Sequence, residues 1–414
     1  MNMEYLSTQP YKGVRDFYPE DMAIQRYIFD GWAKTAERFG YARVDASIFE
    51  PSALYRAKGQ ENEEMVNEQT YTFTDRGDRE VTLRPELTPT LARMIAGKRH
   101  ELYFPVRWYS IPNLYRYERP QRGRLREFWQ LNADVFGDNT IACDVDMLVY
   151  VANIFKDFGA TLDTFVIRVN DRGWMNSVFD SLNLTDEQKR AMFLLLDKKN
   201  KITAAAFDAE AKEIIGADFT LPSPSADSRI MQTVNILHDL GITNVVIDPA
   251  IVRGFNYYTG LVFEIYDTNE ENSRALGGGG RYDNLTEMFG GDPITGIGFG
   301  MGDVSMVNFL ITHQLLPENL TPAPTLTILP LEEIAAGEAI KIANKFRAEY
   351  IATVVDATDR KLGKKLEHAC DDGIKFALVL GSDEVTSQSY TLKNLFTREQ
   401  TTGTAEELIK KILS

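Results

Sequence analysis

Six arginines lie close together between residues 107 and 126 of this 414-residue chain. They are Arg107, Arg116, Arg119, Arg122, Arg124 and Arg126, and Glu118, Glu127 and Gln130 lie among or just after them. The planar guanidinium group forms two parallel hydrogen bonds with phosphate oxygens, so this cluster is suited to hold a triphosphate. A solvated, salt-bridged face of a sheet is the alternative that residue types alone leave open.

Two antiparallel strands are predicted to position these arginines. Residues 104–118 (FPVRWYSIPNLYRYE) and 125–137 (LREFWQLNADVFG) alternate aromatic or branched side chains with polar ones, and PQRGR between them is typical of a turn. Alternation places Arg124, Arg126 and Gln130 on one face of the returning strand. The pattern therefore predicts a rigid, basic sheet with a flexible basic loop at its end.

Two later segments carry further candidates. Arg253 stands shortly before Tyr257 and Tyr258, which favours a pocket for a phosphate and an aromatic ring, although a buried tyrosine pair is more often part of a core. The glycine-rich stretch 277–302 lacks the GxGxxG spacing of a dinucleotide-binding loop. Its later glycines alternate with apolar residues, which predicts a strand that a ligand or another backbone segment approaches closely.

Composition limits the class of protein. The formal net charge of −15 argues against non-specific coating of nucleic acid, but it leaves room for local basic patches. No apolar run approaches the ~18 residues of a membrane helix, and the first residues do not resemble a signal peptide. Cys143 and Cys370 are far apart and the four histidines are scattered, so we expect a cytoplasmic protein with reduced thiols and no metal held by protein motifs.

The chain is too long for one hydrophobic core, and its pattern predicts α/β and α+β domains. A proline-bearing linker at 317–324 predicts a boundary between a first domain, 1–320, and a second, 325–414. Strands and helices alternate in the second domain, which is typical of a small, mostly parallel sheet. Within the first domain, residues 174–242 are predicted to be mostly helical.

Taken together, these segments resemble the histidyl-tRNA synthetase family of class II aminoacyl-tRNA synthetases, in the family's order. The resembling segments are YKGVRDFYP (11–19), FGYARVDASIFEP (39–51, motif 1), TLRPELTPTLAR (82–93), YRYERPQRGRLREFWQLNADVFG (115–137, motif 2), VRGFNYYTGLVFEIY (252–266), GGGGRYDNL (277–285) and residues 325–414. Motif 2 combined with the Arg–Gly–x–x–Tyr–Tyr segment is highly specific, and the resemblance covers nearly the whole chain.

The resemblance implies a class II antiparallel sheet flanked by helices, a helical insertion at about 174–242 and a C-terminal α/β anticodon-binding domain. The implied activity is that of a histidine–tRNA ligase, which activates histidine with ATP and Mg²⁺ and transfers it to tRNA(His). Motif 1 implies a homodimer. The resemblance implies no association with a membrane.

The resemblance also implies residue roles. Arg116, Glu118 and Arg124 match positions that hold ATP, and Arg116 and Arg253 match catalytic positions at the α-phosphate. Histidine would be bound by Glu86, Thr88, Gln130, Asp134, Arg253, Tyr257 and Tyr258. Gln121 and Arg122 would face the acceptor end of the tRNA. On residue types alone, Glu86 and Thr88 indicate only a helix N-terminus with a capping threonine.

The chain departs from the family pattern in motif 3. In the aligned stretch GFGMGDVSM (298–306), Ser305 stands at the position of an arginine that lies along ATP, and Val304 stands at that of a glutamate. Losing a charge-assisted contact removes roughly 1.5–3 kcal/mol. Asn256 also stands where aspartate is usual. These departures leave open a non-catalytic histidine-binding paralogue, such as the regulatory subunit of ATP phosphoribosyltransferase.

Two features favour the synthetase over that paralogue. The regulatory subunit generally lacks a complete anticodon-binding domain, whereas residues 325–414 resemble one. A histidine sensor also has no need of the intact basic loop of motif 2. A stress-sensing tRNA-binding domain is a third reading, but it would normally be attached to a kinase segment, and none is present.

Overall fold

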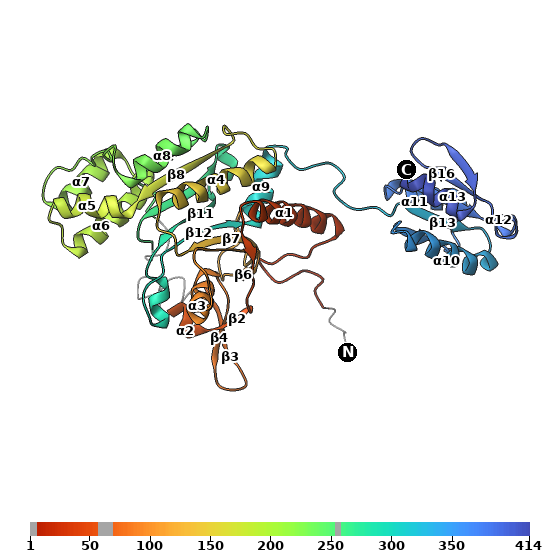
Figure 1. The fold of residues 1–414 in the computed structure, drawn as a ribbon, viewed down its shortest axis with the longest axis horizontal. Helices are drawn as coiled ribbons and strands as arrows, with labels where there is room; N and C mark the ends of the chain where they lie inside the picture. The colour runs from red at the N-terminus through yellow and green to blue at the C-terminus, as the bar shows by residue number, and fades with distance from the viewer. Residues whose placement is uncertain (1–5, 57–68, 253–257) are drawn as a thin grey trace. The chain divides into compact units, whose positions relative to one another are not determined.

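The computed structural model describes residues 6–56, 69–252 and 258–414, and it divides into two compact units, Met1–Glu318 and Asn319–Ser414 (Figure 1). The division falls inside the proline-bearing stretch 317–324. Each unit has a separate hydrophobic core. In the part of the chain that is described, no helix combines the length and the apolar character that crossing a bilayer requires.

The first unit is built on one large sheet, with nine strands among the described residues. Their order is β1 (Ala42–Arg43), β5 (Val106–Ser110), β7 (Glu127–Phe136), β12 (Gly296–Gly302), β11 (Ala275–Tyr282), β10 (Leu261–Asp267), β8 (Phe165–Asp171) and β9 (Val245–Ile247), with β6 (Asn113–Tyr115) also paired to β7. The interior pairs are antiparallel, and only the two edge pairs, β1–β5 and β8–β9, are parallel. The predicted class II antiparallel sheet is therefore confirmed.

Strand β7 shows why the two faces of this sheet differ. Leu131, Ala133 and Val135 point into the main core beneath the helices α1 (Pro19–Arg38), α4 (Ile141–Asp157), α8 (Arg229–Asp239) and α9 (Asp303–Thr312). Figure 1 shows these helices along one side of the sheet, with α2 (Ser52–Arg56) and α3 (Thr88–Lys98) on the other. Because side chains alternate along a strand, Gln130 and Asp134 face the second side.

The second side carries a smaller core and a small sheet. Leu91 and Ile95 of α3 pack with Phe136 of β7 and Tyr282 of β11. The small sheet has the order β2 (Phe49–Pro51), β4 (Glu80–Leu83) and β3 (Tyr71–Thr74), and β3 and β4 form an antiparallel hairpin. These elements enclose the face of the sheet on which Gln130 and Asp134 lie.

One strand prediction was wrong in detail. Residues 104–118 form two short strands, β5 and β6, and not one. The break falls at Pro112, which has no backbone N–H to donate to a sheet. Strand β5 pairs with residues 132–136 of β7 and β6 with residues 127–129, so both pieces still line up on the same partner.

The helical insertion has a core of its own. It comprises α5 (Arg172–Ser181), α6 (Asp186–Lys198), the 3-10 helix η3 (Lys199–Lys201) and α7 (Ala204–Ile215), before α8 returns to the large sheet. Met175, Phe179, Met192 and Leu196 are buried together there. Thr185 and Gln188 form a capping box at the start of α6, and Thr203 caps α7, so the boundaries of both helices follow from local sequence.

The second unit is a five-stranded α/β domain, counted over its described residues. Its sheet has the order β14 (Thr353–Val355), β13 (Leu326–Pro330), β15 (Phe376–Leu380), β16 (Tyr390–Asn394) and β17 (Gln400–Gly403), and the first three strands are parallel. Helices α10 (Glu333–Ala348), α11 (Leu362–Asp371), α12 (Ser382–Ser387) and α13 (Ala405–Leu413) accompany them. The mixed multidomain fold class is therefore confirmed.

Candidate functional site

The arginine cluster separates into groups with different partners. Arg116 and Arg124 line a cavity of about 730 Å³ on the second side of the large sheet. Arg107 forms an ion pair with Asp146 at 2.6 Å and does not line that cavity. Arg126, expected on the same face as Arg124, lies 4.0 Å over the ring of Tyr117. Only part of the cluster therefore faces a ligand-sized space.

Arg116 is fixed from two directions. Its Nε donates a hydrogen bond to the backbone oxygen of Pro85 at 2.9 Å, and its guanidinium lies 5.2 Å over the ring of Phe128. Arg124 is paired with Glu118, with 2.6 Å between Nε and Oε2. The Glu118 side chain is almost fully buried, whereas that of Arg124 is 40% exposed. Both arginines are thus oriented before any ligand arrives.

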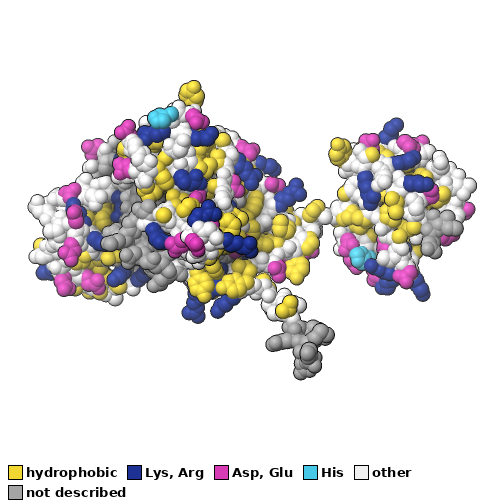
Figure 2. All heavy atoms as spheres, turned by 90° about the horizontal axis from the view of Figure 1, so that it is seen from below, with side chains coloured by type: hydrophobic (Ala, Val, Ile, Leu, Met, Phe, Trp, Pro, Cys, Tyr) yellow, Lys and Arg dark blue, Asp and Glu magenta, His cyan; other side chains and the backbone are white. Residues whose placement is uncertain are grey.

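The cavity is large enough for a nucleotide, since ligand pockets range over ~300–1,000 Å³. Its cations are Arg116, Arg124, Arg168, Lys201 and Arg274, and its acids are Glu118, Asp197 and Glu264. Lys201 and Asp197 come from the helical insertion, which therefore forms one wall. Although the net charge of the chain is negative, Figure 2 shows Lys and Arg side chains spread among the acidic ones on the face that it presents.

Asp134 lies farther along β7 and is buried. Its Oδ1 accepts a hydrogen bond from the hydroxyl of Tyr282, and its Oδ2 has no hydrogen-bond partner among the described residues. Burial raises the pKa of this carboxyl to about 7, even though the Tyr282 hydrogen bond acts in the opposite direction. A buried acid with one open oxygen is suited to receive a polar or cationic ligand group.

Two glycines of β12 make room for these side chains. A Cβ on Gly298 would lie 2.2 Å from Asp134 Oδ1, and one on Gly300 would lie 2.2 Å from Gln130 Nε2. The close approach predicted for the glycine-rich stretch therefore involves side chains from the neighbouring strand β7. Gln130 itself lines the large cavity and donates a hydrogen bond to Asn132 at 2.8 Å.

The remaining histidine-site candidates are described to different extents. Tyr258 is half-buried and close to β11, because a Cβ on Gly280 would lie 2.9 Å from its ring. Glu86 is buried just before α3. Thr88 is the first residue of α3, and the N-cap position belongs to Leu87, so the expectation of a capping threonine was wrong. Arg253 and Tyr257 lie outside the described residues.

Tyr282 was missed by the sequence analysis. It lies in β11 opposite Gly296, and its hydroxyl reaches Asp134 past Gly298, so three strands are needed to bring the pair together. Desolvation raises the pKa of Tyr282 well above its ordinary value, and the nearby Asp134 acts in the same direction. The only local signal was that a large polar aromatic residue directly follows four glycines and an arginine.

The loop of motif 2 is a tight turn. Gln121 and Arg124 exchange backbone hydrogen bonds of 2.9 and 3.0 Å, and Gly123 has a positive φ of 76°. Gln121 and Arg122 are exposed. The Arg122 Nε donates to Asn272 Oδ1 at 3.2 Å, so this side chain is directed toward the short helix η4 (Glu270–Asn272).

The start of α9 holds the departure in motif 3. Ser305 is half-buried and lines both the large cavity and a smaller one of about 280 Å³. Two residues earlier, Asp303 forms an ion pair with Arg15 at 2.8 Å and accepts the backbone N–H of Trp129 at 3.0 Å. Burial raises the pKa of Asp303, and Arg15 opposes that change. Asp303 therefore ties α9 to β7 and to the N-terminal segment.

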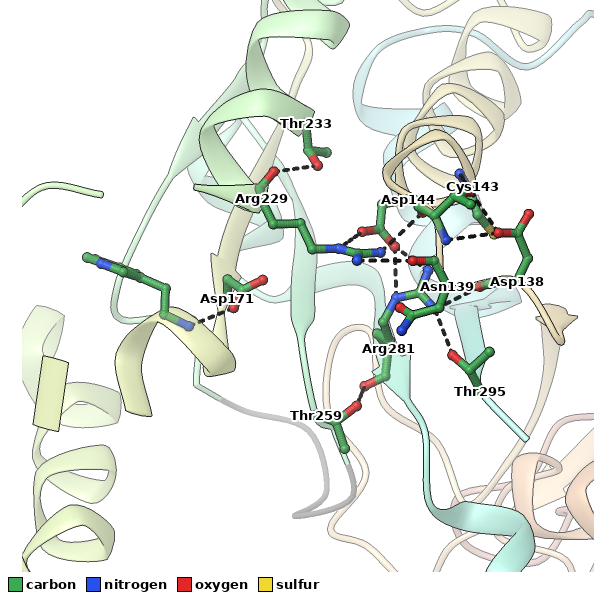
Figure 3. A network of polar contacts seen from close by, with 12 residues as sticks. Asp138, Asn139, Cys143, Asp144, Asp171, Arg229, Thr233, Thr259, Arg281 and Thr295 are labelled. Carbon is green, nitrogen blue, oxygen red and sulfur yellow. Dashed lines mark hydrogen bonds and ion pairs between the residues drawn. The ribbon is translucent and has the colours of Figure 1, made fainter. Parts of the chain in front are cut away.

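A buried ionic network supports β11 (Figure 3). Asp144 of α4 is fully buried and forms ion pairs with Arg281 at 2.5 Å and with Arg229 at 2.6 Å. The backbone oxygen of Arg281 accepts a hydrogen bond from Thr259, which follows Tyr258 directly. Removing one partner of such a network leaves an uncompensated buried charge. The network therefore anchors the strand that carries Tyr282 and the segment that carries Tyr258.

Comparison with known proteins gives a consistent result. Residues 13–215 and 221–304 match the histidyl-tRNA synthetase family, and residues 325–414 match the anticodon-binding domain family. The chain is similar to a histidine–tRNA ligase of Leptospira biflexa, with 40% identity over all of this chain and 99% of the relative. A histidine–tRNA ligase of Thermoplasma volcanium is 35% identical over 96% of each chain. The structure of apo Staphylococcus aureus histidyl-tRNA synthetase is 26% identical, with a TM-score of 0.77 over 99% of this chain and 100% of that one.

Proposed function

The chain belongs to the histidyl-tRNA synthetase family, and on that premise we propose that it is a histidine–tRNA ligase that activates histidine with ATP and transfers the histidyl group to tRNA(His). The observation that carries this proposal is the shared sheet face. Gln130 lines the cavity of Arg116 and Arg124, and Asp134 lies four residues farther along the same strand. A nucleotide-sized basic space and a buried acidic residue therefore lie on one face of the same strand.

We propose that ATP lies against the motif 2 hairpin. Arg116 would bind the α-phosphate, because it lines the cavity and its contact with Pro85 holds its guanidinium in place. Arg124 would bind the phosphates farther along, with Glu118 orienting its guanidinium. Arginine forks provide paired hydrogen bonds to phosphate oxygens, which favours these two side chains for the role.

The histidine substrate would occupy the space around Asp134. The open Oδ2 would accept a hydrogen bond from the ligand, and Gln130, Glu86, Thr88 and Tyr258 would complete the pocket. Arg253 and Tyr257 remain predictions from the family resemblance. A site built on buried hydrogen bonds rejects analogues that cannot make them, which would explain selection of histidine over apolar amino acids.

The chemistry requires charge neutralisation and alignment more than covalent help. The carboxylate oxygen of histidine attacks the α-phosphorus, and the bond to the bridging oxygen of pyrophosphate breaks. Both partners are anions, so Arg116 and Arg253 would lower the barrier by binding the phosphate between them. In the second step the histidyl group moves to the terminal ribose of the tRNA.

Mg²⁺ would arrive bound to ATP. No group of three or more metal-type side chains exists within the described ranges, but Glu118 and Glu264 line the cavity. One or two carboxylates together with substrate phosphates form a usual Mg²⁺ site, so the residues fit that ion. Mg²⁺ would supply further charge neutralisation on the phosphates.

The partners follow from the two units. The anticodon-binding domain, 325–414, would bind the anticodon of tRNA(His), and Gln121 and Arg122 would contact its acceptor end. A homodimer through the motif 1 region is supported by three exposed apolar residues, Phe49 and Phe73 on the small sheet and Ile48 just before it. We further propose that the protein works in the cytoplasm, where its two free cysteines would stay reduced.

The decisive experiment is pyrophosphate exchange with histidine, ATP and Mg²⁺, followed by charging of tRNA(His). We expect histidine-dependent exchange and charging, with no exchange for phenylalanine. Histidine binding without exchange at any ATP concentration would replace the proposal by the non-catalytic histidine-binding paralogue. The complete anticodon-binding domain favours the ligase, because that paralogue generally lacks it.

A further inference from the structure

The cavity has a wall without the arginine that the family pattern places there. Ser305, in the first turn of α9, lines the large cavity and also the smaller one beside it. A serine hydroxyl carries no charge, so this position cannot neutralise a phosphate. Triphosphate binding at this wall would therefore require a cation from another element.

Arg274 is placed to supply that cation. It lies between η4 and β11, outside the sequence of motif 3, and it lines the same two cavities as Ser305. The point that a Cβ would occupy on Gly123 lies 3.9 Å from Arg274 Cδ and also 3.9 Å from Ser305 Oγ. The two side chains therefore converge on the turn of the motif 2 loop.

Two other nearby arginines are less suited to this place. Arg122 lines only the smaller cavity and not the large one that Arg116 and Arg124 line. Arg15 lines neither of these two cavities. Lys201 lines the large cavity from the helical insertion and not from the α9 wall.

We propose that Arg274 takes over the work of the absent motif 3 arginine and binds the β- and γ-phosphates of ATP. The inference rests on the proposed function and extends it to a residue that motif comparison does not identify. As histidine attacks the α-phosphorus, the electron pair of the breaking bond passes to pyrophosphate. Arg274 stabilises the negative charge that accumulates there, together with Arg124, which lines the same cavity.

The first test measures ATP affinity directly, by calorimetry with Mg²⁺ and histidinol present. Arg274→Ala should weaken ATP binding and lower kcat/KM for ATP in pyrophosphate exchange about 10- to 100-fold, with histidine affinity unchanged. Arg274→Lys should recover part of the loss, because it keeps the charge but not the fork. Arg26→Ala, which removes an exposed arginine of α1, is the matched control and should leave both values within twofold.

The second test moves the charge. Adding Ser305→Arg to the Arg274→Ala variant should raise its ATP affinity at least tenfold, because the side chains of residues 274 and 305 approach the same turn. Thermal unfolding will show whether the Arg274→Ala protein is folded. If it is folded and its ATP affinity is within threefold of the parent's, the inference is overturned. The inference is also overturned if Ser305→Arg recovers no ATP affinity.

The two proposals fail separately. If the unaltered protein shows no histidine-dependent exchange, the ligase function is wrong, but the dependence of ATP affinity on Arg274 still decides the present inference. If the unaltered protein exchanges and Arg274→Ala is indistinguishable from it, only the role of Arg274 is wrong. Absence of any ATP binding by the unaltered protein would overturn both.

Discussion

The two ends of the site are built in different ways. Around Asp134, side chains are buried and cross between strands, and glycines leave room for each one. Around Ser305, the cavity is broad and its cations come from the motif 2 hairpin, β8, the helical insertion and the segment before β11. A buried hydrogen bond needs particular atoms at particular positions, whereas phosphate charge can be neutralised from several directions. Substitution in motif 3 is therefore easier to compensate than substitution near Asp134.

The largest expected effect comes from Arg116, which lines the phosphate end and is proposed to bind the α-phosphate. Arg116→Ala should lower kcat/KM for pyrophosphate exchange about 10²- to 10³-fold, because the α-phosphate loses a preorganised donor. Histidine affinity, measured by calorimetry without ATP, should change less than threefold. An equal loss of histidine affinity would show that the ends are not separable. Arg26→Ala again serves as the control.

The position of the Asp134 carboxylate can be changed without substituting a charged residue. Gly298→Ala would place a methyl group 2.2 Å from Asp134 Oδ1, so the carboxylate must move. We expect the KM for histidine to rise about 100-fold and the KM for ATP to stay within threefold. Gly97→Ala in α3 is the matched control, because no atom lies within 4 Å of the new methyl group. An unchanged KM for histidine would show that the position of Asp134 is not critical.

The smallest predicted effect concerns pH and stability. Burial raises the pKa of Asp134 to about 7, whereas an unfolded aspartate has a pKa of ~3.9. The folded state therefore holds this proton more tightly, so stability is fully present below pH ~4 and declines as the pH rises to about 7. Asp134→Asn should raise the unfolding temperature at pH 8 relative to the parent protein, with little difference at pH 4.

The same substitution should lower histidine-dependent exchange by less than Arg116→Ala does, because the amide lacks the charge but keeps an oxygen that accepts a hydrogen bond. The comparison of urea unfolding curves at the two pH values separates the effects. The upper limit on the gain at pH 8 is roughly 4 kcal/mol, from ~1.4 kcal/mol for each unit between the two pKa values. A loss of stability at pH 8 on Asp134→Asn substitution would contradict the conclusion that the buried, ionised carboxylate destabilises the folded protein at that pH.

Short-range patterns predicted much of this arrangement. Period-two alternation placed Gln130 on the correct face of β7, and the glycine spacing in β12 predicted a close approach. Alternation alone could not predict that Arg126 stays outside the cavity, because a strand pattern says nothing of the aromatic ring of Tyr117 that its guanidinium contacts. The break at Pro112 was visible in the sequence but was outweighed by the aromatic run around it.

Long-range contacts could not be predicted in the same way. Tyr282 and Asp134 are 148 residues apart in sequence, and their hydrogen bond depends on the registers of the three strands β7, β12 and β11. Arg274 has no sequence neighbour that suggests a phosphate, and its place beside Ser305 follows only from how β11 and α9 approach the motif 2 turn. Contacts of this kind are properties of the packed sheet and not of any segment.

The pairing of Arg15 with Asp303 has a consequence for synthesis of the protein. The partners are 288 residues apart in sequence. At roughly 5–20 residues per second, a ribosome needs about 15–60 s to reach the second partner after the first. During that interval Arg15 has no Asp303 to bind, so the start of α9 joins the N-terminal segment only late in translation. The cavity wall that α9 forms is therefore completed only when nearly the whole first unit has left the ribosome.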